Sequence, residues 1–195
     1  MSQVIVDGTG TGNVMEVDPQ HRAAVLADER PELYALNLAG RMFVAPFAGV
    51  TPTGGSSIFL WLGNTTQWNL RVARVDVYCG SLEAVEIHTD AVPASISNGL
   101  VGTLVSMNTI GQFALAPSTV ATIVGQTVNF LVTASALTGP GAGSIVGYAA
   151  IAANTANLWT PPSPLIVSPG FALYLKTQVG GHALTGAIYF AVDQT

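Results

Sequence analysis

Charged side chains are scarce in this 195-residue chain, which has six Lys and Arg and eleven Asp and Glu, or 9% of its residues. An ordinary soluble domain carries roughly 25%. The hydrophobic content of 49% nevertheless excludes intrinsic disorder, because disordered chains are rich in charge and poor in apolar residues. A chain of this length and apolar content predicts one folded domain with a sizeable core, two at most.

The shortage of charge is greatest in the second half of the chain. From Ala91 to Val192 the only formally charged side chain is that of Lys176. A folded chain of 20.1 kDa has enough surface to leave its charges spread at about one per 500 Å². Apolar surface with so little charge usually marks an interface. We therefore expect other subunits to cover much of this surface.

Three other features that the sequence lacks limit the partners that the chain could bind and the compartment in which it could fold. The chain has no cluster of Lys and Arg and a net charge of -5, which argues against binding to nucleic acid. No apolar run reaches about 18 residues, and Met1–Gly8 has no basic region, so we expect neither a membrane span nor a secretion signal. Cys79 is the only cysteine, which predicts a reducing compartment and a fold held together by its core and by assembly.

The composition changes near residue 40. Residues 1–40 contain most of the acidic side chains and the glycine run Gly8–Gly12, and we interpret them as an extended N-terminal arm. Within this arm, Pro19–Arg30 has the propensity of a short helix. Residues 41–195 have a different pattern, which predicts a separate β domain.

Beyond residue 40, apolar residues alternate with polar ones, the pattern of strands with one buried face. The alternation is clearest over residues 73–79, 171–175 and 184–192. The apolar positions that we expect to be buried there are Ala73, Val75, Val77, Cys79, Phe171, Leu173, Leu175, Leu184, Ile188, Phe190 and Val192.

Ile58–Leu62 is apolar at every position, which predicts a central strand covered by another sheet on one face and by a neighbouring subunit on the other. About ten short strands separated by turns, without helical periodicity, predict an all-β fold, an antiparallel jelly roll or β-sandwich. The weaker candidate strands are Phe43–Phe47, Val85–His88, Leu104–Met107, Val120–Val124, Val128–Val132, Ile145–Ile151 and Leu165–Val167.

Motifs for catalysis and for cofactors are missing. The chain has three histidines and no Gly-x-Ser-x-Gly element, so a hydrolytic triad is not predicted. The run Gly8–Gly12 lacks the Lys-Ser/Thr of a phosphate-binding loop, and we interpret it as a hinge. We therefore predict no catalytic residue and no cofactor.

One group of side chains could bind a metal. Glu86, His88 and Asp90 are spaced at i, i+2 and i+4, so a regular strand projects all three from one face, where they could hold a divalent cation. The competing interpretation, which we favour, is a solvated strand face with Val85 and Ile87 turned inward.

The three tryptophans suggest different roles. Trp61 lies in an apolar run and is expected in the core, whereas Trp68 follows a polar tip and is a candidate for contact with a sugar or another ligand. Trp159 precedes Pro161 and Pro162, and it could anchor a subunit interface in the way that buried aromatic side chains often do.

Two parts of the chain resemble the tailed-bacteriophage virion proteins of the capsid decoration or cement type. Gly10–Val25 resembles the opening of these proteins, with a small-residue stretch, an apolar-x-x-Val-Asp pattern and then Arg22. Ser57–Asn64, a polar tip and then Leu70–Ser81 resemble the strand, turn and second strand of the family. The turn at Pro169–Gly170 is a weaker match. The resemblance covers about half of the chain and leaves residues 91–165 unassigned.

The resemblance implies a jelly-roll subunit without enzyme activity, typically a trimer. Such a subunit docks on the outside of an icosahedral head after synthesis in the bacterial cytoplasm. Its partners would be the major capsid protein and further copies of itself, with no nucleic acid and no membrane involved. The residues that we expect at capsid or subunit contacts are Val4, Ile5, Val6, Val14, Val17, Arg22 and Trp159.

Two other functions remain open from the sequence. The chain could be a glycan- or receptor-binding jelly roll of a head or tail fibre, with Trp68 at the contact. It could also be a cupin-like metal enzyme, which would require Glu86, His88 and Asp90 to enclose a metal inside the barrel.

Overall fold

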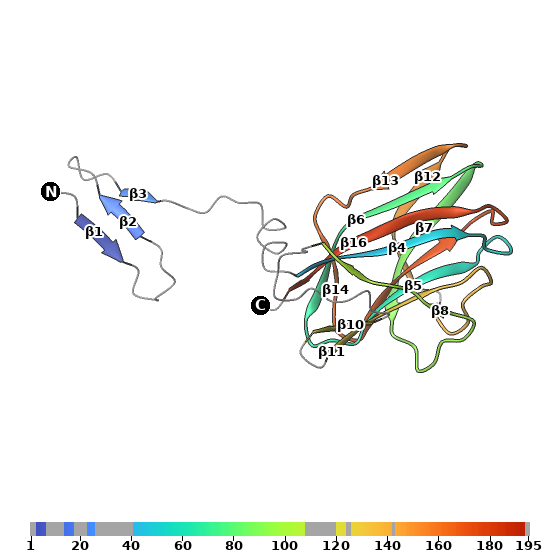
Figure 1. The fold of residues 1–195 in the computed structure, drawn as a ribbon, viewed down its shortest axis with the longest axis horizontal. Coiled ribbons are helices and arrows are strands. Elements are labelled where there is room, and N and C mark those ends of the chain that lie inside the picture. The colour runs from blue at the N-terminus through green and yellow to red at the C-terminus, as the bar shows by residue number, and fades with distance from the viewer. Residues whose placement is uncertain are drawn as a thin grey trace. The chain divides into compact units, whose positions relative to one another are not determined.

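The computed structural model describes residues 41–107, 120–123, 126–141 and 143–193, together with the backbone of three N-terminal strands (Figure 1). The chain divides into two compact units, Met1–Tyr34 and Ala35–Thr195. All regular structure in the described residues is β-strand. No helix in this part of the chain has the length and apolar character needed to span a bilayer.

The N-terminal unit contains a small antiparallel sheet. Its strands are β1 (Gln3–Val6), β2 (Val14–Val17) and β3 (Ala23–Val25), in the order β1-β2-β3. The helix predicted over Pro19–Arg30 is wrong at residues 23–25, because β3 pairs there with β2, and Val25 lies opposite Met15. Pairing along a sheet has overridden the local helix propensity of this alanine-rich stretch.

The second unit consists of two antiparallel sheets. The larger has the order β10-β11-β5-β15-β7-β12, with β8 also paired to β11. Its strands are β5 (Ile58–Asn64), β7 (Glu83–Ala91), β8 (Leu100–Val101), β10 (Val120–Ile123), β11 (Gln126–Val132), β12 (Ser144–Ile151) and β15 (Phe171–Thr177).

The smaller sheet has the order β13-β6-β16-β4-β9, with β14 also paired to β6. Its strands are β4 (Met42–Val50), β6 (Asn69–Cys79), β9 (Val105–Ser106), β13 (Thr155–Trp159), β14 (Leu165–Val167) and β16 (Leu184–Asp193).

The strand order identifies the fold as a jelly roll. Four strands of one sheet, β5-β15-β7-β12, face four of the other, β4-β16-β6-β13, and the chain passes between the two sheets as it connects them. Two four-stranded sheets with this crossed connectivity are the jelly-roll form of the β-sandwich. The predicted fold class is confirmed. The long connection from β7 to β12 supplies the extra strands β8 to β11.

The main core fills the space between the sheets with apolar side chains. The predicted pattern of the last strand is confirmed, since Leu184, Ile188, Phe190 and Val192 are all fully buried. Phe171 is an exception because it lies at the very start of β15 and is 48% exposed. Each of the weaker candidate strands overlaps a strand of the structure, although Leu104–Met107 contains only the two-residue β9, and Val124 lies outside the described residues.

The alternation of buried positions in strand β6 shifts by one residue part-way along the strand. Val75, Val77 and Cys79 are buried as predicted, but Ala73 is not. The register against β16 shifts between Tyr189 and Phe190, so β6 carries a β-bulge at this point. A bulge inserts one extra residue, so that odd-numbered positions face the core after it where even-numbered positions face it before. Before it, the buried side chains of β6 are Leu70 and Val72.

The outer face of β5 is covered by the chain itself. Trp61 packs there in a second apolar cluster with Leu137, Ala172 and Tyr174. The backbone N–H of Leu137 donates a hydrogen bond to the carbonyl of Ile58 at 2.8 Å, which ties the covering segment to the strand. The expectation that a neighbouring subunit covers this face is wrong, because Val92, Ile96 and Leu137, which lie between β7 and β12 in the chain, pack in this cluster.

Candidate functional site

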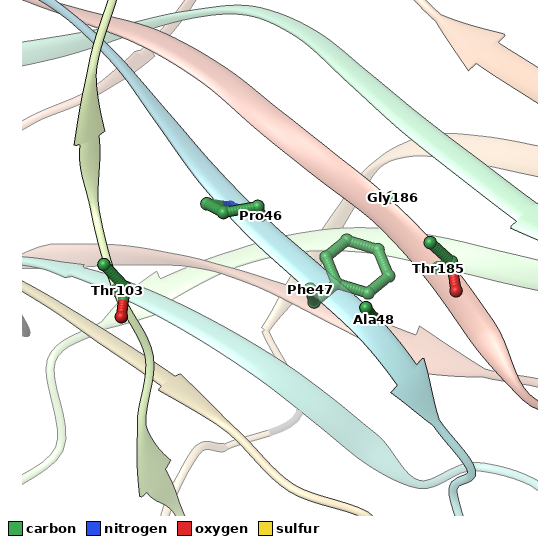
Figure 2. Close-up of a pocket in the computed structure, with 6 residues that line it drawn as sticks. All are labelled: Pro46, Phe47, Ala48, Thr103, Thr185 and Gly186. Atoms are coloured by element: carbon green, nitrogen blue, oxygen red, sulfur yellow. The ribbon is translucent and has the colours of Figure 1, made fainter. Parts of the chain in front are cut away.

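A shallow, uncharged hollow lies beside β4 (Figure 2). It has a volume of about 450 Å³. Thr103, from the connection between β8 and β9, lies on the side of the hollow opposite Thr185. The residues that line it are Pro46, Phe47, Ala48, Thr103, Thr185 and Gly186.

Local features of β4 and β16 shape this hollow. Pro46 pairs with Ala187 of β16, but it has no N–H with which to bind a further strand on its other side. Proline within a sheet is usually found at such an edge position. Gly186 has no side chain, and a Cβ there would overlap the carbonyl oxygen of Asp76 and crowd the ring of Phe47. The Thr185 hydroxyl accepts a hydrogen bond from the Gly49 N–H at 3.2 Å, which fixes one wall.

An exposed apolar strip borders the hollow. Leu100 and Val101 are 75% and 56% exposed, and Val105 and Met107 are also exposed, whereas Leu104 between them is buried as an anchor. Because β8 pairs with β11 of one sheet and β9 with β4 of the other, the strip crosses the edge of the sandwich from sheet to sheet. We call the hollow and this strip together the β4–β9 surface.

A second uncharged region lies at the opposite edge of the sandwich, where β12 and β13 are the outermost strands of the two sheets. In Figure 1 these strands are at the top, while β8, β10 and β11 are at the bottom. Ile145 and Leu158 are 59% and 58% exposed, and Val146 and Tyr148 are exposed as well. We call these four residues, together with the half-buried Trp159 beside them, the β12–β13 edge.

A buried polar cluster occupies the outer face of β7. Glu86 and His88 are only 9% and 3% exposed. His88 Nε2 lies 2.9 Å from Glu86 Oε2, and the ring of Tyr174 stacks on the imidazole with centroids 4.9 Å apart. The Gln178 amide donates to Glu86 Oε1 at 2.5 Å, and Lys176 Nζ is 3.6 Å from Oε2.

This cluster corrects the preferred interpretation of β7. Val85 and Ile87 face the core as predicted, but Glu86 and His88 are not on a solvated face, because side chains from β15 and the following loop cover them. The hydrogen bond from His88 is the largest of the effects that lower the pKa of Glu86, followed by that from Gln178. Burial raises the pKa of the Tyr174 phenol, and the charges of Asp90 and Glu86 raise it further.

The cupin-like hypothesis does not fit this geometry. Glu86 and His88 lie on the outer side of their sheet, and the space between the sheets is filled by the apolar core. Within residues 41–107, 120–123, 126–141 and 143–193 there is no group of three His, Cys, Asp or Glu side chains that could hold a metal ion.

The polar tip before Trp68 is a compact turn built around Asn64. Asn64 is fully buried; its amide donates to the carbonyls of Trp68 and Val167, and its Oδ1 accepts from the N–H and hydroxyl of Thr66. The Trp68 side chain is half-buried and packs against the main core. Its role as a ligand contact stays a prediction.

The other predicted contact residues are distributed over both units. Trp159 is half-buried, packs on the main core and lies over Gly147, where a Cβ would overlap its indole ring. Five more lie in the N-terminal sheet, and Arg22 lies outside the described residues. The five, in β1 and β2, are Val4, Ile5, Val6, Val14 and Val17.

The apolar strip was not predicted as a contact. Its sequence signal is a pair of short apolar segments, Leu100–Val101 and Leu104–Val105, in a stretch without charge. Comparison with known proteins gives no match to a family model, to a curated protein or to a solved structure.

Proposed function

We propose that this chain is a non-enzymatic structural protein of a bacteriophage head, which decorates the outer surface of the capsid and bridges neighbouring major capsid proteins. The observation that carries the proposal is the pair of uncharged apolar regions on opposite edges of the jelly roll, the β4–β9 surface and the β12–β13 edge. Exposed regions of this kind usually mark protein interfaces.

The mechanism would be mechanical. Burial of apolar surface contributes about 25 cal/mol per Å², and a stable interface buries more than about 1,000 Å² in total. Many copies that each span a boundary between capsid proteins add these contributions over the whole shell. The outward pressure of the packaged genome would then have to break all of these contacts together.

The N-terminal unit would provide the attachment to the shell. A three-stranded sheet with strands of four, four and three residues is too small to bury a core of its own. Contact with a capsid protein through Val4, Ile5, Val6, Val14, Val17 and Arg22 would cover it. The net charge of -5 suits a protein on the outside of the head, away from the DNA.

Co-sedimentation with purified heads tests this function. The full chain should pellet with heads at a fixed number of copies per head, and a variant that begins at Ala35 should lose most of this binding. The control is Leu82→Lys, at an exposed position in the turn between β6 and β7, which should bind as the wild type does. Failure of the full chain to bind heads would overturn the proposed function.

A further inference from the structure

The β4–β9 surface and the β12–β13 edge differ in shape. The first contains a hollow of about 450 Å³, whereas the second presents exposed aliphatic side chains, above all Ile145 and Leu158. Neither the lining of the hollow nor strands β12 and β13 contain a charged residue. The lining of the hollow and the exposed aliphatic side chains of the second region can therefore cover each other without burying an unpaired charge.

Neither edge is suited to pairing with a copy of itself through its backbone. Strand β12 has a register shift between Ile145 and Gly147. The Asn157 side-chain amide donates a hydrogen bond to the carbonyl of Ala150 at 2.8 Å. Bulges and covered edge groups of this kind block the addition of another strand. On β4, Pro46 has no N–H to donate, and β9 already pairs with Phe43 and Val44. Any association here has to rely on side-chain packing.

We infer that copies of this chain associate head to tail, with the β12–β13 edge of one copy packed into the β4–β9 surface of the next. Because the two regions lie on opposite edges of the sandwich, each copy has one of each to offer. Repeated contacts between unlike surfaces produce a ring when the rotation closes. The inference rests on the proposed function for the idea that many copies assemble on one shell, and it identifies the two faces through which these copies meet.

Two variants of the full chain separate this arrangement from its alternatives. The edge variant carries Ile145→Lys and Leu158→Lys, and the hollow variant carries Ala48→Lys and Val101→Lys. All four positions are exposed, so each lysine can stay in water in the free chain. Leu82→Lys, at an exposed apolar position outside both regions, is the matched control.

The measurement is the molar mass in solution by analytical ultracentrifugation. The wild type and the Leu82→Lys control should form a closed multiple of the 20.1 kDa chain, whereas each double variant alone should be a single chain. An equimolar mixture of the two double variants should form a species of two chains and nothing larger. In that species the intact hollow of the edge variant binds the intact edge of the hollow variant, and the two remaining surfaces are blocked.

Three results would overturn the inference. They are a wild type that stays a single chain at every concentration, a double variant that still dimerises alone, and a mixture that forms no two-chain species. Far-ultraviolet circular dichroism checks the fold, and if a double variant is unfolded, Leu158→Lys or Val101→Lys alone replaces it. A wild type that binds heads yet stays a single chain contradicts only this inference, and a ring that does not bind heads contradicts only the proposed function.

Discussion

His88 Nε2 lies 2.9 Å from Glu86 Oε2, and both side chains are buried on the outer face of the larger sheet. A carboxylate can only accept hydrogen bonds, so the imidazole N–H donates to Glu86. The same carboxylate accepts from Gln178 and lies near Lys176. The ionised form of Glu86 is thus stabilised by three neighbours that the unfolded chain does not hold together.

The first prediction concerns stability at acid pH. The pKa of Glu86 is lowered from 4.5, chiefly by the hydrogen bond from His88. Its ionisation therefore contributes stability that is complete above pH 4.5 and is lost as the pH falls through the lower folded value. We expect the free energy of unfolding in urea to decline below pH 4.5 in the wild type.

Glu86→Gln should remove this part of the decline, since an amide does not titrate. Asp90→Asn, on the same face of β7, controls for the loss of one negative charge. An unfolding free energy of Glu86→Gln that falls with pH as steeply as that of the wild type would contradict the assignment.

The second prediction concerns Glu83, which holds the loop between β15 and β16. Its buried carboxylate accepts hydrogen bonds from the N–H groups of Ala84, Val179 and Gly180, at 2.9, 3.0 and 2.9 Å. Glu83→Ala leaves these donors without their partner, so we expect a loss of stability on the order of 3 kcal/mol. Amide hydrogen exchange at Val179 and Gly180 should become faster.

Glu83→Gln keeps one carbonyl oxygen as an acceptor and should lose less stability than Glu83→Ala. Equal unfolding free energies for the wild type and Glu83→Ala would show that the carboxylate does not hold this loop.

The third prediction concerns the contact between the edges of the two sheets. A Cβ on Gly147 would overlap the indole ring of Trp159, so Gly147→Ala should cost about 1–3 kcal/mol through overpacking. It should also change the tryptophan fluorescence. Gly54→Ala is the matched control because a Cβ there meets no atom within 4 Å. The same stability for both variants would disprove the contact.

Strand alternation predicted most of the sandwich because burial between two sheets selects every second residue. The prediction failed at Ala73, where a bulge shifts the buried positions from Leu70 and Val72 to Val75 and Val77. The alternation of apolar and polar residues does not reveal where a bulge lies, because the position of the extra residue depends on the register with β16. Strand β13 was not predicted either, because five residues with mostly small or polar side chains resemble a loop.

The candidate site was harder to predict than the fold. The scarcity of charge predicted covered surface but gave no location for it. Trp61 lies under the chain's own long connection, while Leu100 and Val101 in that same connection are exposed. Both outcomes depend on how residues 92–107 and 126–141 fold across the sheets, and local sequence patterns do not contain this information. The burial of Glu86 and His88 depends in the same way on side chains from β15 and the loop after it.

The fourth prediction separates a structural role of Trp68 from glycan binding. Its side chain packs against the main core, and its carbonyl accepts from Asn64 and Thr66. Trp68→Ala should therefore reduce the free energy of unfolding by about 2 kcal/mol, less than for a fully buried tryptophan. Urea unfolding measures this, and glycan-array binding of the wild type should be absent. Glycan binding that Trp68→Ala abolishes without a loss of stability would instead favour the fibre protein.

The central claim is that the two uncharged edges of the jelly roll are covered in the working assembly. Carbene labelling of the wild-type chain bound to heads, compared with the single-chain edge and hollow variants, tests it most directly. The account predicts that on heads the label is lost from Leu100 and Val101 and from Tyr148 and Val146, while Leu82 is labelled equally in all samples. Equal labelling of the two edges in the bound and free chains would contradict the account.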